Sequence, residues 1–233
     1  MHAKQKGFTL IELLVVIAII AIMAVIALPN MSQWIASRRV ASNAEQIANL
    51  LRFARSEAVR LNLPVYVCPV PIRIDGQPNT KKQCENKTDA KSGEDYKDHV
   101  LIAFADQDND KQYTRRVDIS LRTVPLNHYS KGQFLKRVEH NYFIRPFGEN
   151  QTSDSQIAWT FLPNGNFVRW KETPSKDKSF PTPSGYSKIT LTDANASNGD
   201  KKARSTVLFI DGSGRVEICA KSDSRDICQY SEK

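Results

Sequence analysis

The sequence lacks the residue patterns on which most enzymes depend. Only four histidines occur in 233 residues, at positions 2, 99, 128 and 140. None of them accompanies a serine or cysteine nucleophile motif such as G-x-S-x-G. Neither a phosphate-binding P-loop nor a dinucleotide fingerprint is present. We therefore expect no enzymatic activity and no cofactor, and we interpret His99, His128 and His140 as ordinary surface or turn residues.

Other absences narrow the class of protein further. The mean hydropathy of −0.44 excludes a membrane protein with many spans. Hydrophobic residues make up 40% and charged residues 25%, which suits a folded core and excludes collagen-like, coiled-coil-only and disordered chains. No internal repeat is visible, and the length favours one domain with an appendage.

One long apolar block stands apart from this average. Residues 8–28 contain only two polar residues, Thr9 and Glu12, and a helix needs about 20 apolar residues to cross a bilayer. The block is too long for the core of an ordinary secretory signal. Lys4 and Lys6 precede it, and positive charge tends to stay on the cytoplasmic side. We therefore expect a single span with the rest of the chain outside the cytoplasm.

Glu12 is unusual inside such a block, because a carboxylate in an apolar span is costly and needs a partner or a purpose. The run K-G-F-T-L-I-E-L-L-V-V-I at residues 6–17 resembles the prepilin signature of type IV pilins and type II secretion pseudopilins. The resemblance implies a leader, residues 1–7, that a prepilin peptidase removes after Gly7. It also implies N-methylation of Phe8 and a role for Glu12 in registering one subunit against the next. The alternative is a plain signal anchor with a tolerated acid.

The helical pattern continues past this block. In the family that the N-terminal run resembles, a helix kink or local melting usually occurs at the position of Pro29. The resemblance therefore implies that residues 8–29 form the transmembrane or filament-core part. Beyond it, apolar residues step by four and three along one face: Val40, Ala44, Ile47, Leu51, Ala54, Ala58 and Leu61. We expect a helix from about Thr9 to Leu61, because the residue before Pro64 avoids the helical conformation. Residues 30–62 should pack on the head.

The rest of the chain, residues 63–233, has the pattern of many short strands. Apolar or alternating runs bounded by Gly, Asp or Asn are typical of antiparallel strands. We expect strands at residues 65–68, 100–104, 117–124, 157–162, 166–170, 189–191, 207–210 and 215–219. Two polar stretches, about 75–98 and 171–188, are surface inserts in this interpretation. The predicted fold class is α+β, a long N-terminal helix packed on an antiparallel β-sheet head, as in the type IV pilin fold.

The four cysteines allow three pairings. A location outside the cytoplasm favours disulfides. The absence of C-x-x-C and of clustered histidines argues against zinc. We prefer the sequence-local pairs Cys68–Cys84, across the first insert, and Cys219–Cys228, which closes the C-terminal tail into a loop.

Alternating acids at Asp106, Asp108 and Asp110 are a calcium candidate, because short oxygen side chains at this spacing converge in a loop. An EF-hand loop would then have glycine and glutamate where Lys111 and Val117 stand. Two strands joined by Asp and Asn residues are also typical of a plain turn. We therefore predict no metal site and keep calcium as the alternative.

The net charge of +8 is compatible with attraction to DNA or to another anionic surface. Several of the cations fall in the predicted helix. By default we interpret these as a solvated helix face: Arg38, Arg39, Arg52, Arg55 and Arg60.

Two further stretches resemble the GspH/FimT/FimU branch of minor pilins. They are R-F-A-R-S-E-A-V at residues 52–59 and G-R-V-E-I-C at residues 214–219. The resemblance, FimU-like in detail, implies a subunit of a tip complex that primes type IV pilus assembly for twitching, adhesion and DNA uptake. The implied partners are other minor pilins, the major pilin, the prepilin peptidase/methyltransferase and the inner-membrane assembly platform. The implied location is the inner membrane with a periplasmic head, and then the pilus tip at the cell surface.

Two alternatives within this family stay open. FimT-like competence pilins bind DNA through a Gly-Arg-x-Arg motif, which makes Arg215 a candidate DNA contact. Here Glu217 takes the place of the second arginine, so an attraction to phosphate is replaced by a repulsion. The structural interpretation is therefore preferred. A GspH-like pseudopilin of type II secretion is the other alternative.

Overall fold

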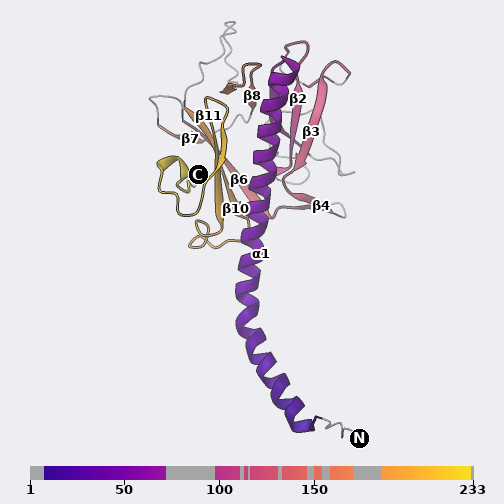
Figure 1. The fold of residues 1–233 in the computed structure, drawn as a ribbon, viewed down its shortest axis with the longest axis vertical. Helices are drawn as coiled ribbons and strands as arrows, with labels where there is room; N and C mark the ends of the chain where they lie inside the picture. Colours follow the sequence, from indigo (N-terminus) through magenta and orange to yellow (C-terminus); the bar gives the residue numbers. More distant parts are fainter. Residues whose placement is uncertain are drawn as a thin grey trace, which may run out of the picture.

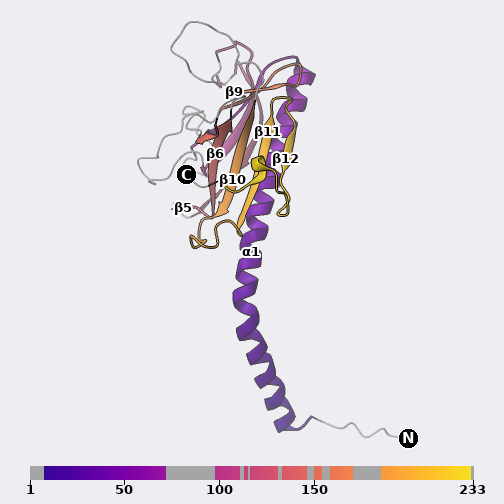
Figure 2. The ribbon, with the colours of Figure 1, turned by 90° about the vertical axis from the view of Figure 1, so that its left-hand side faces the viewer.

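A long helix and a β-rich head make up the computed structural model. It describes residues 8–71, 98–110, 113–114, 116–130, 133–145, 150–153, 158–169 and 185–231. The single long helix, α1 (Leu10–Leu61), has an N-terminal half that projects alone and a C-terminal half that lies along the head (Figures 1 and 2). The predicted fold class, a long helix packed on antiparallel sheets, is confirmed.

Both ends of α1 follow from local sequence. Thr9 has an extended backbone, and its hydroxyl accepts a hydrogen bond from the backbone N–H of Glu12 at 3.3 Å. This satisfies one of the N–H groups that a helix start leaves open. At the other end, Asn62 adopts the left-handed conformation with φ 54°, which stops the helix two residues before Pro64.

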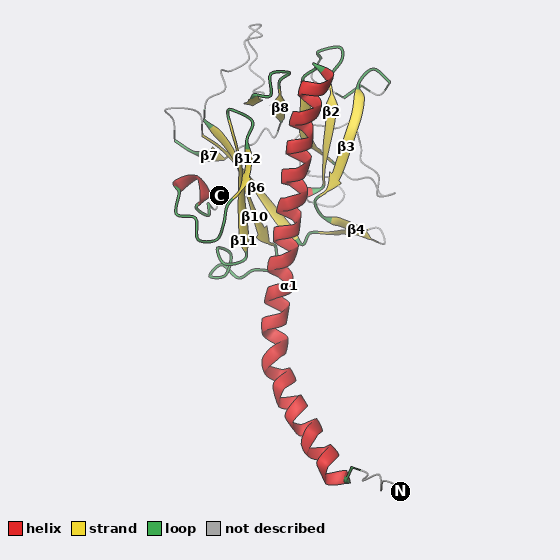
Figure 3. Cartoon of the chain, in the orientation of Figure 1, coloured by secondary structure: helices red, strands yellow, loops and turns green. Residues whose placement is uncertain are grey.

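In the described residues the head forms two five-stranded antiparallel sheets, where the sequence led us to expect one sheet. Figure 3 shows strands of the head beside α1. The strand order of the first is β3 (Ile119–Pro125), β2 (Val100–Ala105), β1 (Val65–Val70), β8 (Trp159–Phe161) and β9 (Phe167–Arg169). That of the second is β12 (Val216–Ile218), β11 (Ser205–Asp211), β10 (Tyr186–Asp193), β6 (Val138–Arg145) and β7 (Thr152–Ser153). A small hairpin joins β4 (His128–Ser130) to β5 (Gln133–Leu135), and a 3-10 turn, η2, spans Asp226–Cys228.

The C-terminal half of α1 packs against both sheets, contacting β1, β2 and β3 of the first and β10, β11 and β12 of the second. The predicted apolar stripe is the packed face: its members from Val40 to Ala58 are all buried, and Leu61 packs at the edge of the core. Large buried side chains of the sheets, Trp159, Phe161 and Leu101, complete this core. Burying one Leu or Ile side chain contributes about 1.5–3 kcal/mol, so the stripe holds helix and sheets together.

The sequence pattern predicts neither the central strand β6 nor the short strands β4, β5 and β7. Strand β6 pairs with β10 along its whole length, from Val138 opposite Asp193 to Arg145 opposite Tyr186. His140 and Asn141 interrupt its apolar pattern, but both are buried here. The strand predicted at residues 117–124 begins at Ile119 instead, because Asp118 belongs to the preceding turn, where its N–H donates to the carbonyl of Thr114.

The projecting half of α1 stays helical through residues 26–30, the region of Pro29, and the side chains of those five residues are not described. In the part of the chain that the structure describes, no helix carries an apolar run long enough to cross a membrane. This differs from the span predicted over residues 8–28, of which the structure describes the side chains of residues 8–25.

Candidate functional site

The start of α1 presents the residues of the prepilin-like run to solvent. Gly7 lies outside the described residues, whereas Phe8 is 87% exposed and Glu12 is also exposed. Within the described part of the chain, the Glu12 carboxylate has no partner, and its backbone N–H donates to the hydroxyl of Thr9. Thr9 was given no role from the sequence. Its T-x-x-E spacing to Glu12, typical of a capping box, is the signal that identifies it.

The projecting half continues as an exposed apolar column. Every described side chain from Phe8 to Val25 is exposed, including Leu10, Ile11, Ile20 and Met23. A patch of this extent marks a surface that a membrane or another protein covers. One free carboxylate at the tip of an apolar helix is therefore the first candidate site.

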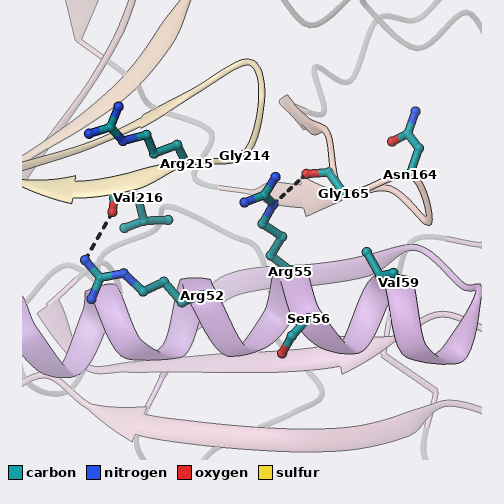
Figure 4. Close-up of a pocket in the computed structure, with 9 residues that line it drawn as sticks. All are labelled: Arg52, Arg55, Ser56, Val59, Asn164, Gly165, Gly214, Arg215 and Val216. Atoms are coloured by element: carbon teal, nitrogen blue, oxygen red, sulfur yellow. Dashed lines mark hydrogen bonds between the residues drawn. The ribbon is translucent and has the colours of Figure 1, made fainter.

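A second candidate site lies near the other end of α1, where the helix meets two turns of the head (Figure 4). We call it the helix–turn pocket; its volume is about 570 Å³. The lining comes from α1, from the β8–β9 turn and from the end of the β11–β12 turn: Arg52, Arg55, Ser56, Val59, Asn164, Gly165, Gly214, Arg215 and Val216. The two family-like stretches, residues 52–59 and 214–219, thus meet in space.

The arginines of the pocket correct the sequence interpretation. Arg55 donates from Nε to the carbonyl of Gly165 at 2.9 Å and from Nη2 to that of Ser213 at 2.8 Å. Arg52 donates from Nη2 to the carbonyl of Val216 at 3.1 Å. Both belong to the surface predicted to be merely solvated, yet each binds backbone of the head. Carbonyls of turns carry no sequence signal, so this role was invisible beforehand.

Gly214 fits against Arg55 because it has no side chain. Its φ is +78°, in the left-handed region, and a Cβ there would lie 2.4 Å from the carbonyl oxygen of Gly165 and 3.0 Å from Nε of Arg55. Glycine is thus required both for the backbone conformation and for the close approach of the two turns.

Arg215 points away from the body of the pocket and is already paired. Its side chain is 69% exposed, and Nη2 lies 3.1 Å from Oε2 of Glu217. Glu217 also binds Arg225. A phosphate approaching Arg215 would therefore meet the carboxylate of Glu217 as well.

The structure describes three of the four cysteines. Cys219 and Cys228 form a disulfide with an S–S distance of 2.02 Å, which is the C-terminal pairing preferred from the sequence. Cys68 is buried in β1, and Cys84 lies outside the described residues.

The acidic loop after β2 gathers one more carboxylate than the sequence pattern suggested. One oxygen each of Asp106, Asp108, Asp110 and Asp118 lies within 4.8 Å of the others. Several of these oxygens already accept backbone N–H groups: Asp106 from Asn109, and Asp118 from Gln107 and Thr114. The loop therefore forms a self-capped turn. Calcium binding at Asp106, Asp108 and Asp110 remains the alternative, with Asp118 as a further candidate ligand.

Two histidines contradict the surface interpretation. His99 and His140 are 1% and 0% exposed, respectively, whereas His128 is exposed as expected. Nδ1 of His140 lies 2.9 Å from Oδ1 of Asp98, which also accepts the His140 backbone N–H. Lys136 lies 3.0 Å from the other oxygen of Asp98. Burial opposes ionisation of Asp98, but His140 and Lys136 outweigh it and hold the pKa of this carboxyl below its ordinary value.

Stability should therefore fall in acid through Asp98. A folded-state pKa below the unfolded one, about 3.9, means that the unfolded chain takes up the proton first as pH decreases. The contribution of ionised Asp98 to the free energy of unfolding is complete well above pH 4 and is lost as pH falls below about 4. Urea unfolding of the chain and of Asp98→Asn, between about pH 3 and 6, measures it. The variant should be less stable by about 3 kcal/mol at pH 6, with a flatter pH dependence; parallel curves would contradict this.

A family model described as the prokaryotic N-terminal methylation motif matches residues 2–28. A second, described as type II transport protein GspH, matches residues 43–207, well over half of the chain. No curated protein matches the sequence.

Similar solved structures include a pilin and a pseudopilin. The type IV minor pilin FimU of Pseudomonas aeruginosa strain PAO1 is 14% identical, with 81% of this chain and 94% of that chain covered and a TM-score of 0.43. The minor pseudopilin EpsH from the Type 2 Secretion System of Vibrio cholerae is 8% identical, with 80% and 99% covered and a TM-score of 0.40. At these values the likeness adds nothing about function. The two family models match consecutive parts of the chain, with the methylation motif before the GspH part. The chain therefore belongs to the family of the type II transport protein GspH, whose members are structural pilins and pseudopilins.

Proposed function

We propose that the chain is a minor pilin of a type IV pilus and belongs to a tip complex that primes assembly. The observation that carries this is the run of exposed side chains from Phe8 to Val25 on α1, with a Glu12 carboxylate that has no partner among the described residues. Such a surface is suited to burial among identical or related helices. Other minor pilins and the major pilin supply those helices.

The route to the filament follows from the N-terminal motif. A prepilin peptidase/methyltransferase cuts after Gly7 and methylates Phe8. Before assembly the projecting half of α1 sits in the inner membrane, with the head in the periplasm. The inner-membrane assembly platform then moves the chain into the pilus, where it reaches the cell surface at the tip.

The observation that favours a second candidate is the family match itself, because its description names type II transport. A pseudopilin would use the same helix and the same Glu12 in a secretion pseudopilus. The two functions predict different phenotypes when the gene is deleted. We expect deletion to reduce surface pili and the chain to be recovered in small amounts in sheared pili. Normal piliation together with blocked secretion of type II substrates would favour the pseudopilin.

A DNA-binding role for Arg215 has less support, because Glu217 pairs with this side chain. A salt titration of DNA binding, with Arg215→Ala as the control, separates this role from the structural one. We expect no binding that depends on Arg215.

A further inference from the structure

The helix–turn pocket has features of a binding site that the assembly of α1 does not use. We propose that it binds a single carboxylate next to an apolar side chain, presented by an acidic segment of a neighbouring protein subunit. The presence of such a subunit rests on the proposed function. The chemistry of the pocket does not.

The charge of the pocket is unbalanced. In the described part of the chain, Arg52 and Arg55 have no carboxylate partner; they donate to backbone carbonyls, and Arg52 also donates to the amide oxygen of Asn49 at 3.4 Å. A guanidinium has five N–H donors, so Nε of Arg52 and Nη1 of Arg55 keep donors for a ligand. Figure 4 shows Arg55 pointing from α1 to the turn at Gly165 and Arg52 extending toward the carbonyl of Val216.

The two arginines are also held in place before any ligand arrives. Three carbonyls, of Gly165, Ser213 and Val216, fix their guanidinium groups. A carboxylate therefore gains charge-assisted hydrogen bonds at a small cost in side-chain freedom. Val59, which is 54% exposed, and Val216 give the pocket an apolar wall for the neighbouring side chain.

The rim selects a single carboxylate over a nucleic acid. The volume of about 570 Å³ holds one or two side chains. Arg215 at the edge is neutralised by Glu217, so the rim carries a carboxylate where a chain of phosphates would pass. One inserted carboxylate that reaches Arg52 and Arg55 avoids this repulsion. The partner is thus an acidic protein segment.

The test uses the full chain in detergent micelles, with the arginine Nε–H signals followed by NMR. Four probes are titrated: the peptide acetyl-Ala-Leu-Glu-Ala-amide, the same peptide with glutamine for glutamate, inorganic phosphate, and a twelve-nucleotide oligothymidylate. We expect saturable shifts of Arg52 and Arg55 with the glutamate peptide and roughly tenfold weaker binding of the glutamine peptide.

Two variants, with a third as a substitute for the first, complete the test. Arg52→Gln should weaken the glutamate peptide roughly tenfold, because a charge-assisted bond is lost. Arg60→Gln, on the same helix but outside the pocket and paired with Glu57, should bind as the unmodified chain does. Unchanged thermal unfolding establishes that each variant is folded. If Arg52→Gln is not folded, Arg52→Lys, which keeps the charge, replaces it in the titration.

Three results would overturn the proposal. They are equal binding of the glutamate and glutamine peptides, no saturable shift with either peptide, and tighter binding of phosphate or the oligonucleotide than of the glutamate peptide. Because peptide binding is measured on the purified chain, these outcomes are independent of whether the chain enters a pilus. Failure of the pocket and failure of the proposed function are therefore distinguishable.

Discussion

Glu12→Ala is expected to be cut after Gly7 as usual but to be largely absent from filaments. In the proposed filament the Glu12 carboxylate would lie among apolar helices, and its expected partner is the N-terminal amine of Phe8 of a neighbouring subunit. Removing one member of a buried ion pair costs about 3–5 kcal/mol, which corresponds to a hundredfold or greater loss of incorporation. Quantitative immunoblots of sheared pili and of membranes measure the partition.

The matched control is Glu45→Ala. Glu45 is also an exposed carboxylate on α1, but it lies in the half that packs on the head. We expect this variant to enter filaments normally. Equal amounts of Glu12→Ala and unmodified chain in sheared pili would contradict the registering role of Glu12.

Gly214→Ala is expected to destabilise the head strongly. A Cβ at this position meets the carbonyl oxygen of Gly165 at 2.4 Å, and the backbone is in the left-handed region at φ +78°. Left-handed strain of about 1–2 kcal/mol adds to an overpacking cost of about 1–3 kcal/mol. The melting temperature should therefore fall by roughly 5–15 °C for a chain of this size. Thermal unfolding followed by circular dichroism measures the change.

Gly199→Ala provides the comparison for that experiment. Nothing lies within 4 Å of a Cβ built at Gly199, so the same substitution should leave the melting temperature nearly unchanged. If both variants had the melting temperature of the unmodified chain, this would contradict the close contact of Gly214 with Gly165 and Arg55.

The helix was predictable because its determinants are local. The spacing of apolar residues from Val40 to Leu61 gave the buried face, and Pro64 gave the end. The prepilin-like run around Glu12 is likewise contiguous in sequence. Short-range patterns of this kind are read without knowing what packs against them.

The rest depends on contacts between distant residues. His140 was placed at the surface because its neighbours are polar, whereas Asp98, which pairs with it, lies 42 residues away. The sequence predicts a solvated Arg55 because the carbonyls that bind it, those of Gly165 and Ser213, are 110 and 158 residues away. Backbone carbonyls are the same in every residue, so no pattern in the sequence announces such bonds.

The mass of the N-terminal peptide, from the chain isolated from its own cells, tests the central claim most directly. A pilin-type subunit is predicted to begin at Phe8 and to carry an N-methyl group, with residues 1–7 absent. A chain that still begins at Met1 would contradict processing, and with it the entry of α1 into a filament.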